Sequence, residues 1–184
     1  MASAQGDSGA ELARNPILAQ ASDSAETVAR TFVDHFKDSD YFSAWFLLSP
    51  AAKQGFVRTT ATLNIKSLLQ IEGMSLPGSV FLNTDGPRSD LVDDFRTDPS
   101  LLFDDLLYAG EQSGTLPFLF GPQASIIEVD IDGIVANASI HTDGEPANLG
   151  LHLVQLSDKT WRVDRVTWDG ADQEGAKPWA LPVN

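Results

Sequence analysis

The C-terminal part of the sequence contains a run of predicted strands, and this run most limits the folds that the chain can adopt. In "SIIEVDIDGIVANASIH", isoleucine and valine alternate with aspartate and glutamate, as in a strand with one buried face. The Asp-Gly pair at 132–133 predicts a two-residue turn before a second strand at 134–141. "LHLVQLSDKTWRVDRVTWDG" predicts another hairpin, with its turn at 157–159. Four consecutive antiparallel strands after a helical half indicate an α+β fold.

The helical half begins with a strong amphipathic pattern. Asp23 is the predicted cap of the first helix, and Glu26 follows three residues later. Val28, Phe32 and Phe36 recur every four residues, which predicts one apolar stripe facing the core.

Three further helices are predicted from their first residues. Ser39 opens a short helix, and the Ser-Pro pair at 49–50 opens another that continues to Gly73. The Asp-Pro pair at 98–99 opens a helix that is expected to stop at Gly110. A short apolar run at 80–82 between turn signals predicts an edge strand.

The apolar residues of the last hairpin do not keep to one face. If Leu156 pairs with Trp161, then His152 faces Arg165, and both strands change their apolar face near that pair. A long hairpin with a strong bend or bulge explains the change, because its two halves can then pack against different elements. The alternative is a sheet that is covered on both faces along its whole length.

These patterns predict one folded domain with two tails. Residues 1–22 form a polar N-terminal tail, residues 23–170 form the α+β domain, and residues 171–184 form a C-terminal tail. Within the domain, the segment near 73–122 is an irregular insertion.

Charge and composition exclude several classes of partner. The chain has 12 Lys and Arg against 26 Asp and Glu, for a formal net charge of -14, so phosphate backbones would be repelled and nucleic-acid binding is not expected. No apolar run is long enough for a transmembrane segment. The start, "MASAQGDSGAELARNP", lacks the pattern of a signal peptide, and its small polar residues predict an exported or periplasmic protein without its leader, or otherwise a cytoplasmic one.

Two segments resemble the nuclear-transport-factor-2-like superfamily, also described as a cystatin-like α+β cone. They are "ETVARTFVDHFKDSDYFSAWFLLSP" and "LHLVQLSDKTWRVDRV", the second with a tryptophan just after its turn. The resemblance covers about 23–57 and 123–168, and the stretch at 73–122 departs from it. It implies N-terminal helices packed on a strongly bent, mostly antiparallel sheet, a pocket between them, and a homodimer through the outer sheet face.

Four polar residues are candidate catalytic groups, on the analogy of enzymes with this fold. His152 lies at the predicted face switch beside Asp164, and is otherwise a satisfied polar residue at a bend. His35 lies at the edge of the first helical stripe, and Tyr41 follows the position where the second helix begins. Packing alone also explains Tyr41, and a partly exposed structural role also explains His35.

Aromatic residues could line a pocket or fill a core. The predicted lining residues are Phe32, Phe36, Trp45, Phe103, Phe118, Phe120 and Trp161. No histidine pair has the spacing of metal ligands and cysteine is absent, so neither a metal site nor a cofactor is expected. The sequence therefore predicts a non-enzymatic module that binds a small apolar ligand or a protein partner. The alternative is a small-molecule isomerase, dehydratase or hydrolase with its active site in the cone.

Overall fold

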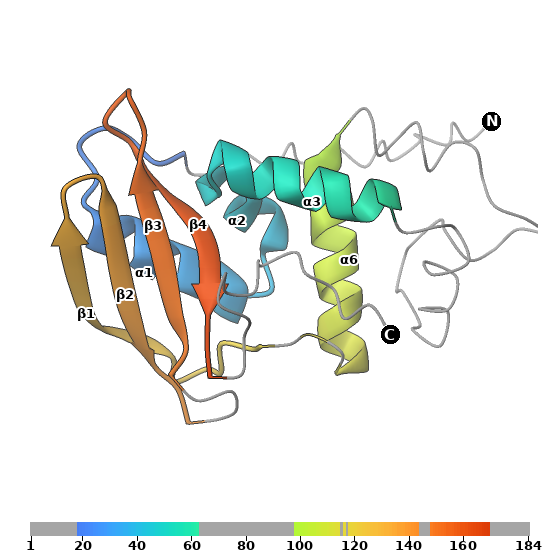
Figure 1. Ribbon diagram of the computed structural model, residues 1–184. Coiled ribbons are helices and arrows are strands. Elements are labelled where there is room, and N and C mark those ends of the chain that lie inside the picture. Colours follow the sequence, from blue (N-terminus) through green and yellow to red (C-terminus); the bar gives the residue numbers. More distant parts are fainter. Residues whose placement is uncertain (1–17, 63–97, 115, 117, 144–147, 170–184) are drawn as a thin grey trace, which may run out of the picture.

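The computed structural model describes residues 18–62, 98–114, 116, 118–143 and 148–169. In these ranges the helices precede the strands along the chain (Figure 1), which confirms the α+β class. The helices are α1 (Ala25–Lys37), α2 (Tyr41–Leu47), α3 (Pro50–Thr62) and α6 (Pro99–Ser113). The strands are β1 (Ser125–Asp132), β2 (Val135–His141), β3 (Gly150–Gln155) and β4 (Trp161–Thr167).

Some predictions lie outside the described residues. These are the tails over 1–17 and 171–184, the continuation of the third helix to Gly73, and the edge strand at 80–82. The irregular insertion is described only from residue 98 onward, where it contains α6.

The predicted helix starts are correct to within one residue. Ser24, rather than Asp23, caps α1, because its hydroxyl accepts a hydrogen bond from the Thr27 amide at 3.1 Å. The predicted apolar stripe of α1 is buried. The end of α6 differs from the prediction: the helix passes through Gly110 and ends at Gly114, whose φ of 66° is the left-handed conformation that favours glycine.

The sheet is antiparallel throughout, with the strand order β1-β2-β3-β4. Its strands follow one another along the chain, so each pairs with the next through a hairpin connection. The strands are not strongly curled (Figure 1), and the cone-like curvature that the resemblance implies is not confirmed. A row of four adjacent strands leaves β1 and β4 at the two edges.

The last hairpin has one inside face, which corrects the predicted face switch in β3. Leu149, Leu151 and Leu153 are all buried, so β3 keeps a single apolar face along its length. The predicted pair of His152 with Arg165 is present, but Trp161 pairs with Gln155 instead of Leu156. The cause is a bulge, where two residues of β4 span the step from His152 to Leu153 in β3.

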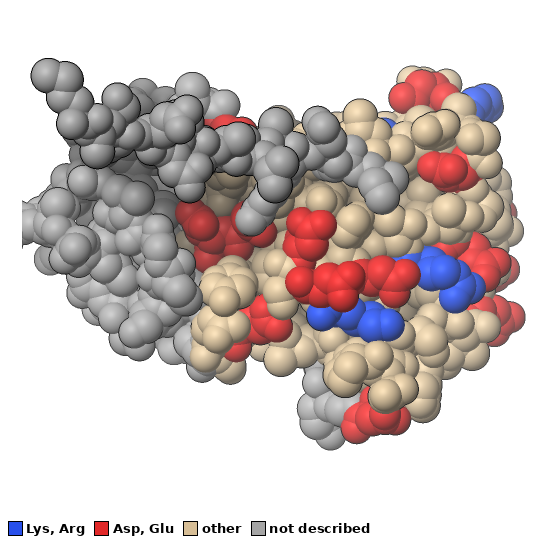
Figure 2. Space-filling model, turned by 180° about the vertical axis from the view of Figure 1, so that it is seen from behind, with Lys and Arg blue, Asp and Glu red and all other residues tan. Residues whose placement is uncertain are grey.

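The helices build the core on one face of the sheet. Helix α1 contacts all four strands and lies across this inner face, while α2 packs between α1 and α6, and α3 starts beside β4. The far side of α1 is charged, with ion pairs between Arg30 and Glu26 at 2.7 Å and between Lys37 and Asp34 at 3.5 Å. Figure 2, seen from behind, shows acidic and basic side chains close together on this side of the molecule.

Candidate functional site

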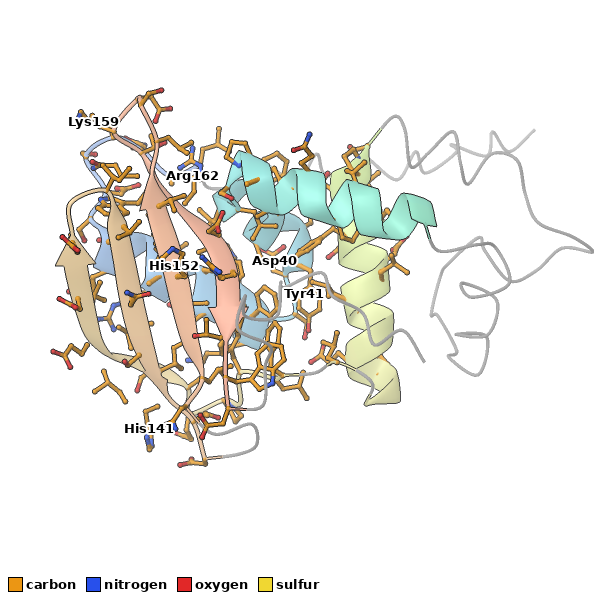
Figure 3. The ribbon with its side chains drawn as sticks, in the orientation of Figure 1. Asp40, Tyr41, His141, His152, Lys159 and Arg162 are labelled. Carbon is orange, nitrogen blue, oxygen red and sulfur yellow. The ribbon has the colours of Figure 1, made fainter. Side chains whose placement is uncertain are left out.

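The outer face of the sheet, opposite α1, carries a row of polar side chains across the strands. Asn137 pairs with His152, and His152 pairs with Arg165, so the three lie side by side on neighbouring strands. Asp130 of β1 continues the row beside Asn137. Figure 3 shows His152 near the middle of the sheet. The bulge in β4 puts Asp164 next to this row.

The surroundings of His152 favour the neutral form of its imidazole. Burial lowers its pKa below the ordinary value of 6.5, and the charge of Arg165 lowers it further, while Asp164 acts in the opposite direction. Its Nδ1 lies 2.9 Å from Oδ1 of Asn137, an arrangement in which Nδ1 donates and Nε2 is left as an acceptor. His152 can therefore accept a proton on the outer face.

Asp164 holds the beginning of α3. Ser49 is 1% exposed, and its hydroxyl donates to Oδ1 of Asp164 at 2.6 Å. The same hydroxyl oxygen accepts from the Ala52 amide at 2.9 Å, which caps the helix. The Ser49 amide donates a hydrogen bond to the Val163 carbonyl at 2.8 Å, and Leu48 forms an isolated parallel β-bridge with Val163. The carboxylate of Asp164 therefore joins β4 to α3.

The other two catalytic candidates lie on the helical side. Nδ1 of His35 is 3.3 Å from Oδ2 of Asp40, while its buried Nε2 has no hydrogen-bond partner among the described residues. Tyr41 is fully buried and donates from its hydroxyl to Oε2 of Glu111 at 3.0 Å. Burial raises the pKa of Tyr41 far above its usual range, and the negative charge of Glu111 raises it further.

The structure brings together only part of the predicted catalytic set. His152 and Asp164 are neighbours at the bulge, and His152 faces away from the core because Leu151 and Leu153 face into it. His35 and Tyr41 belong to α1 and α2 on the opposite side of the sheet (Figure 3). A substrate on the outer face would thus meet His152 but neither of these two groups.

The seven predicted pocket-lining aromatic residues all belong to the hydrophobic core. Phe36 is at the centre of one group, with its ring 4.7 Å from Phe32, 5.9 Å from Phe118 and 5.3 Å from Phe120. Trp45 and Phe103 form a second group, with rings 5.3 Å apart. Such tilted and edge-on pairs are how aromatic side chains fill a core.

Several residues of these networks have no signal in the sequence. Ser49 and Glu111 contact their partners across long stretches of chain, and only the fold brings them together. Asn137 is one of several polar residues on β2, and only the strand register places it beside His152. Lys53 has no such signal either: burial lowers its pKa to about 8, and the charge of Arg162 lowers it in the same direction.

Among the described residues, no group of three or more His, Asp, Glu or Cys could hold a metal ion. No helix in these ranges is long and apolar enough to cross a membrane. Comparisons with protein-family models, curated proteins and solved structures found no match.

Proposed function

We propose that this chain is a non-enzymatic protein-binding module that accepts an extended segment of a partner at the free edge of β1. The observation that carries the proposal is the exposed edge itself. Strand β1 ends the sheet order, and its outer side lies clear of the helices (Figure 1). An edge strand presents unpaired backbone donors and acceptors, which a partner strand can satisfy.

The edge also exposes apolar side chains. Ile127 and Ile134 are each 65% exposed and Ile131 is 53% exposed, although large apolar residues usually lie inside. Ile127 is the extra residue of a bulge in β1, Ile134 belongs to the turn after β1, and Ile131 faces the inner side of the sheet at its edge. A strand added beside β1 would cover part of this surface.

The charges of β1 select the kind of partner. Glu128, Asp130 and Asp132 pair in register with the outward residues of β2, so they share the outer face, and all three are exposed. An added strand with Lys or Arg at alternate positions would place those cations beside the acids. A second copy pairing antiparallel through β1 would instead bring acids opposite acids, which is destabilising. The proposed partner is therefore a basic extended segment of another protein.

The alternatives have less support. The ring-to-ring packing of the aromatic residues favours a filled core over a site for a small apolar ligand. For an isomerase, dehydratase or hydrolase, the candidate groups would have to converge, and His152 and Tyr41 lie on opposite sides of the sheet. Only His152 with Asp164 favours an enzyme, and the carboxylate of Asp164 is already engaged by Ser49.

The resemblance to the nuclear-transport-factor-2-like superfamily stays a proposal, supported by the order of helices before hairpin-connected strands. The homodimer through the outer face is a second proposal. It is supported by opposite charges at the two ends of one row, Asp130 on β1 and Arg165 on β4. Turning a second copy about an axis parallel to the strands would place each charge over its opposite. Light scattering that gives a monomer at every concentration would exclude this dimer.

The edge proposal can be tested with designed peptides. A fluorescent peptide that alternates Lys and Val over the eight residues of β1 is titrated with the protein, and anisotropy reports binding. Two control peptides are used. One replaces Lys by Glu, which removes the charge match, and the other places Pro at every second position, which removes the backbone N–H donors of the β-ladder. We expect binding only by the Lys-Val peptide, weakened by salt because exposed charges are screened.

Variants then locate the site on β1. We expect Asp130→Lys to weaken binding of the Lys-Val peptide at least tenfold and to allow binding of the Glu-Val peptide. Leu119 provides the matched control for Ile131, since it is also exposed, at 41%, but outside the sheet: Ile131→Ser should weaken binding, and Leu119→Ser should not. Equal binding of the Lys-Val and proline peptides, or no effect of Asp130→Lys, would refute the proposal.

A further inference from the structure

The backbone of β1 alternates between groups that bond to β2 and groups that point to the free edge of the sheet. A two-residue turn joins the two strands, and Asp132 and Val135 close the hairpin. In such a hairpin the closing pair exchanges backbone hydrogen bonds, and every second pair after it does the same. Asp132, Asp130 and Glu128 therefore direct their backbone N–H and C=O groups toward β2.

The pairing of β2 with β3 confirms this alternation. The Ile140 amide donates to the Leu149 carbonyl at 2.9 Å, and the carbonyl of Ile134, just before β2, accepts from the Gln155 amide at 2.7 Å. Even-numbered residues along β2 thus bond toward β3, so its odd-numbered residues bond toward β1. The partners of these odd-numbered residues are the three acids of β1.

Val129 and Ile131 consequently present their backbone groups to the free edge. In the described part of the chain, no hydrogen bond outside the sheet ladder involves either residue. The bulge at Ile127 breaks the alternation at one end, and the turn at Gly133 ends the strand at the other. The regular part of the edge is therefore the stretch 128–132, with its hydrogen-bonding groups at Val129 and Ile131.

The side chains of β1 determine what each position of an added strand meets. Val129 and Ile131 point to the inner face, because they pair with the buried Ala138 and Ala136. Residues directly opposite each other on neighbouring strands share one face. A partner residue that hydrogen-bonds to Val129 or Ile131 therefore places its side chain on the inner face, beside apolar atoms. A partner residue opposite Asp130 is in a pair without hydrogen bonds, where side chains approach most closely, and it lies beside the acids.

The surroundings of the sheet indicate the direction of the partner segment. Every strand pair in the sheet is antiparallel, and the described helices build the core on one face (Figure 1). Purely parallel sheets occur almost only where both faces are covered, and parallel pairing is slightly less stable per residue. An added strand is therefore expected to run antiparallel to β1, with its N-terminal end beside Asp132 and its C-terminal end beside Glu128.

We propose that the partner is a short segment that runs antiparallel to β1, with basic residues opposite the three acids and apolar residues opposite Val129 and Ile131. The apolar residues make the backbone hydrogen bonds, and the basic residues lie on the outer face with their own N–H groups turned away from β1. This partner geometry rests on the proposed function of the β1 edge, to which it adds the register and direction of the bound segment.

Backbone N-methylation tests the register. Two versions of the Lys-Val peptide carry the same number of N-methyl groups, on the Val residues in one and on the Lys residues in the other, and both keep every side chain. Anisotropy measures their binding to the full chain. N-methylation of Val should weaken binding about tenfold or more, because it removes the N–H donors to Val129 and Ile131. N-methylation of Lys should change the affinity by less than about twofold, because those N–H groups point away from β1. Equal losses, or a larger loss with methylated Lys, would overturn the register.

Disulfide trapping tests the direction. The chain has no cysteine, so Ser125→Cys and Ile134→Cys each introduce a single thiol, at the start of β1 and just beyond its end. The Lys-Val peptide carries a cysteine at its N-terminus or at its C-terminus, and mass spectrometry measures the disulfides formed with each variant in a glutathione redox buffer. The N-terminal cysteine should couple about tenfold more to the Ile134→Cys variant than to the Ser125→Cys variant, and the C-terminal cysteine should show the reverse preference.

The outcomes separate this partner geometry from the edge proposal itself. Reversed preferences, or none, would overturn the antiparallel direction. The edge proposal would still stand if the Lys-Val peptide bound the unmodified protein and lost affinity for Asp130→Lys. No binding of the Lys-Val peptide to the unmodified protein would refute the edge proposal and the partner geometry together. Circular dichroism confirms that both cysteine variants are folded.

Discussion

Replacing Ser49 by alanine tests the joint between β4 and α3 most directly. The hydroxyl of Ser49 makes two contacts at once: it accepts from the Ala52 amide at 2.9 Å and donates to the Asp164 carboxylate at 2.6 Å. Loss of a helix cap costs about 1 kcal/mol. Loss of a hydrogen bond to a charged group costs about 1.5–3 kcal/mol, and the side chain of Asp164, only 24% exposed, would be left without this partner. Ser49→Ala should thus lower the free energy of unfolding by about 3 kcal/mol.

Ser24 offers a matched control at the start of α1. Its hydroxyl also caps a helix, by accepting from the Thr27 amide at 3.1 Å, and it shares a hydrogen bond with the exposed Thr27 hydroxyl at 2.9 Å; within the described residues it has no hydrogen bond to a carboxylate. Ser24→Ala removes the cap and an exposed hydroxyl–hydroxyl contact but no bond to a charged group, so it should cost about 1 kcal/mol. Urea unfolding of both variants, followed by circular dichroism, gives the two free energies under the same conditions.

A double-mutant cycle then isolates the contact between Ser49 and Asp164. The single variants Ser49→Ala and Asp164→Ala and the double variant should show a coupling of about 1.5–2 kcal/mol, because each single change already removes the shared hydrogen bond. A coupling near zero, or equal costs for Ser49→Ala and Ser24→Ala, would refute the inference that Asp164 anchors α3.

Three further predictions concern the core and the sheet. Tyr41→Phe should cost about 1–2 kcal/mol in urea unfolding, because it removes the hydroxyl that donates to Glu111; an unchanged midpoint would show that this bond adds nothing. Gly150→Ala should lower the free energy of unfolding by about 1–3 kcal/mol, since its Cβ would lie 2.8 Å from a backbone oxygen of β2. Gly121→Ala has open space around the new Cβ and should be nearly neutral. Equal effects of the two substitutions would contradict the packing argument. The pKa of His152 lies below 6.5 in the folded chain, so the unfolded chain binds more protons as the pH falls, and stability is lost below about pH 6.5. His152→Gln should therefore reduce the fall in melting temperature between about pH 7.5 and pH 5.5. An identical fall in both proteins would count against a lowered pKa of His152.

Local patterns were sufficient for the elements of this fold. The period of four in Val28, Phe32 and Phe36 predicts a buried helical stripe, and those side chains are buried. The alternation in β1 and β2 predicts a hairpin around the Asp-Gly turn, and the two strands pair in that way. Such features depend on neighbours within one helix turn or one hairpin, which is why a single sequence reveals them.

The register of the last hairpin was only partly predictable. The pairing of His152 with Arg165 is predicted from a pairing of Leu156 with Trp161; the first is correct, whereas Trp161 pairs with Gln155. The alternation alone predicts a face switch in both strands, whereas the structure has an extra residue in β4 only, at the bulge beside Asp164. A bulge adds one residue to a single strand, and only the structure shows which strand contains it.

The sequence by itself thus determined the α+β class, the helix starts and the acidic, cysteine-free character of the chain, because these depend on composition and short-range periodicity. Tertiary structure alone decided which polar residues meet. It placed His152 on the outer face of the sheet and Tyr41 in the core among the helices, joined Asp164 to Ser49, and brought the hydroxyl of Tyr41 to Glu111. These contacts join residues far apart in the chain, and their partners are set by how helices pack on the sheet rather than by any local pattern.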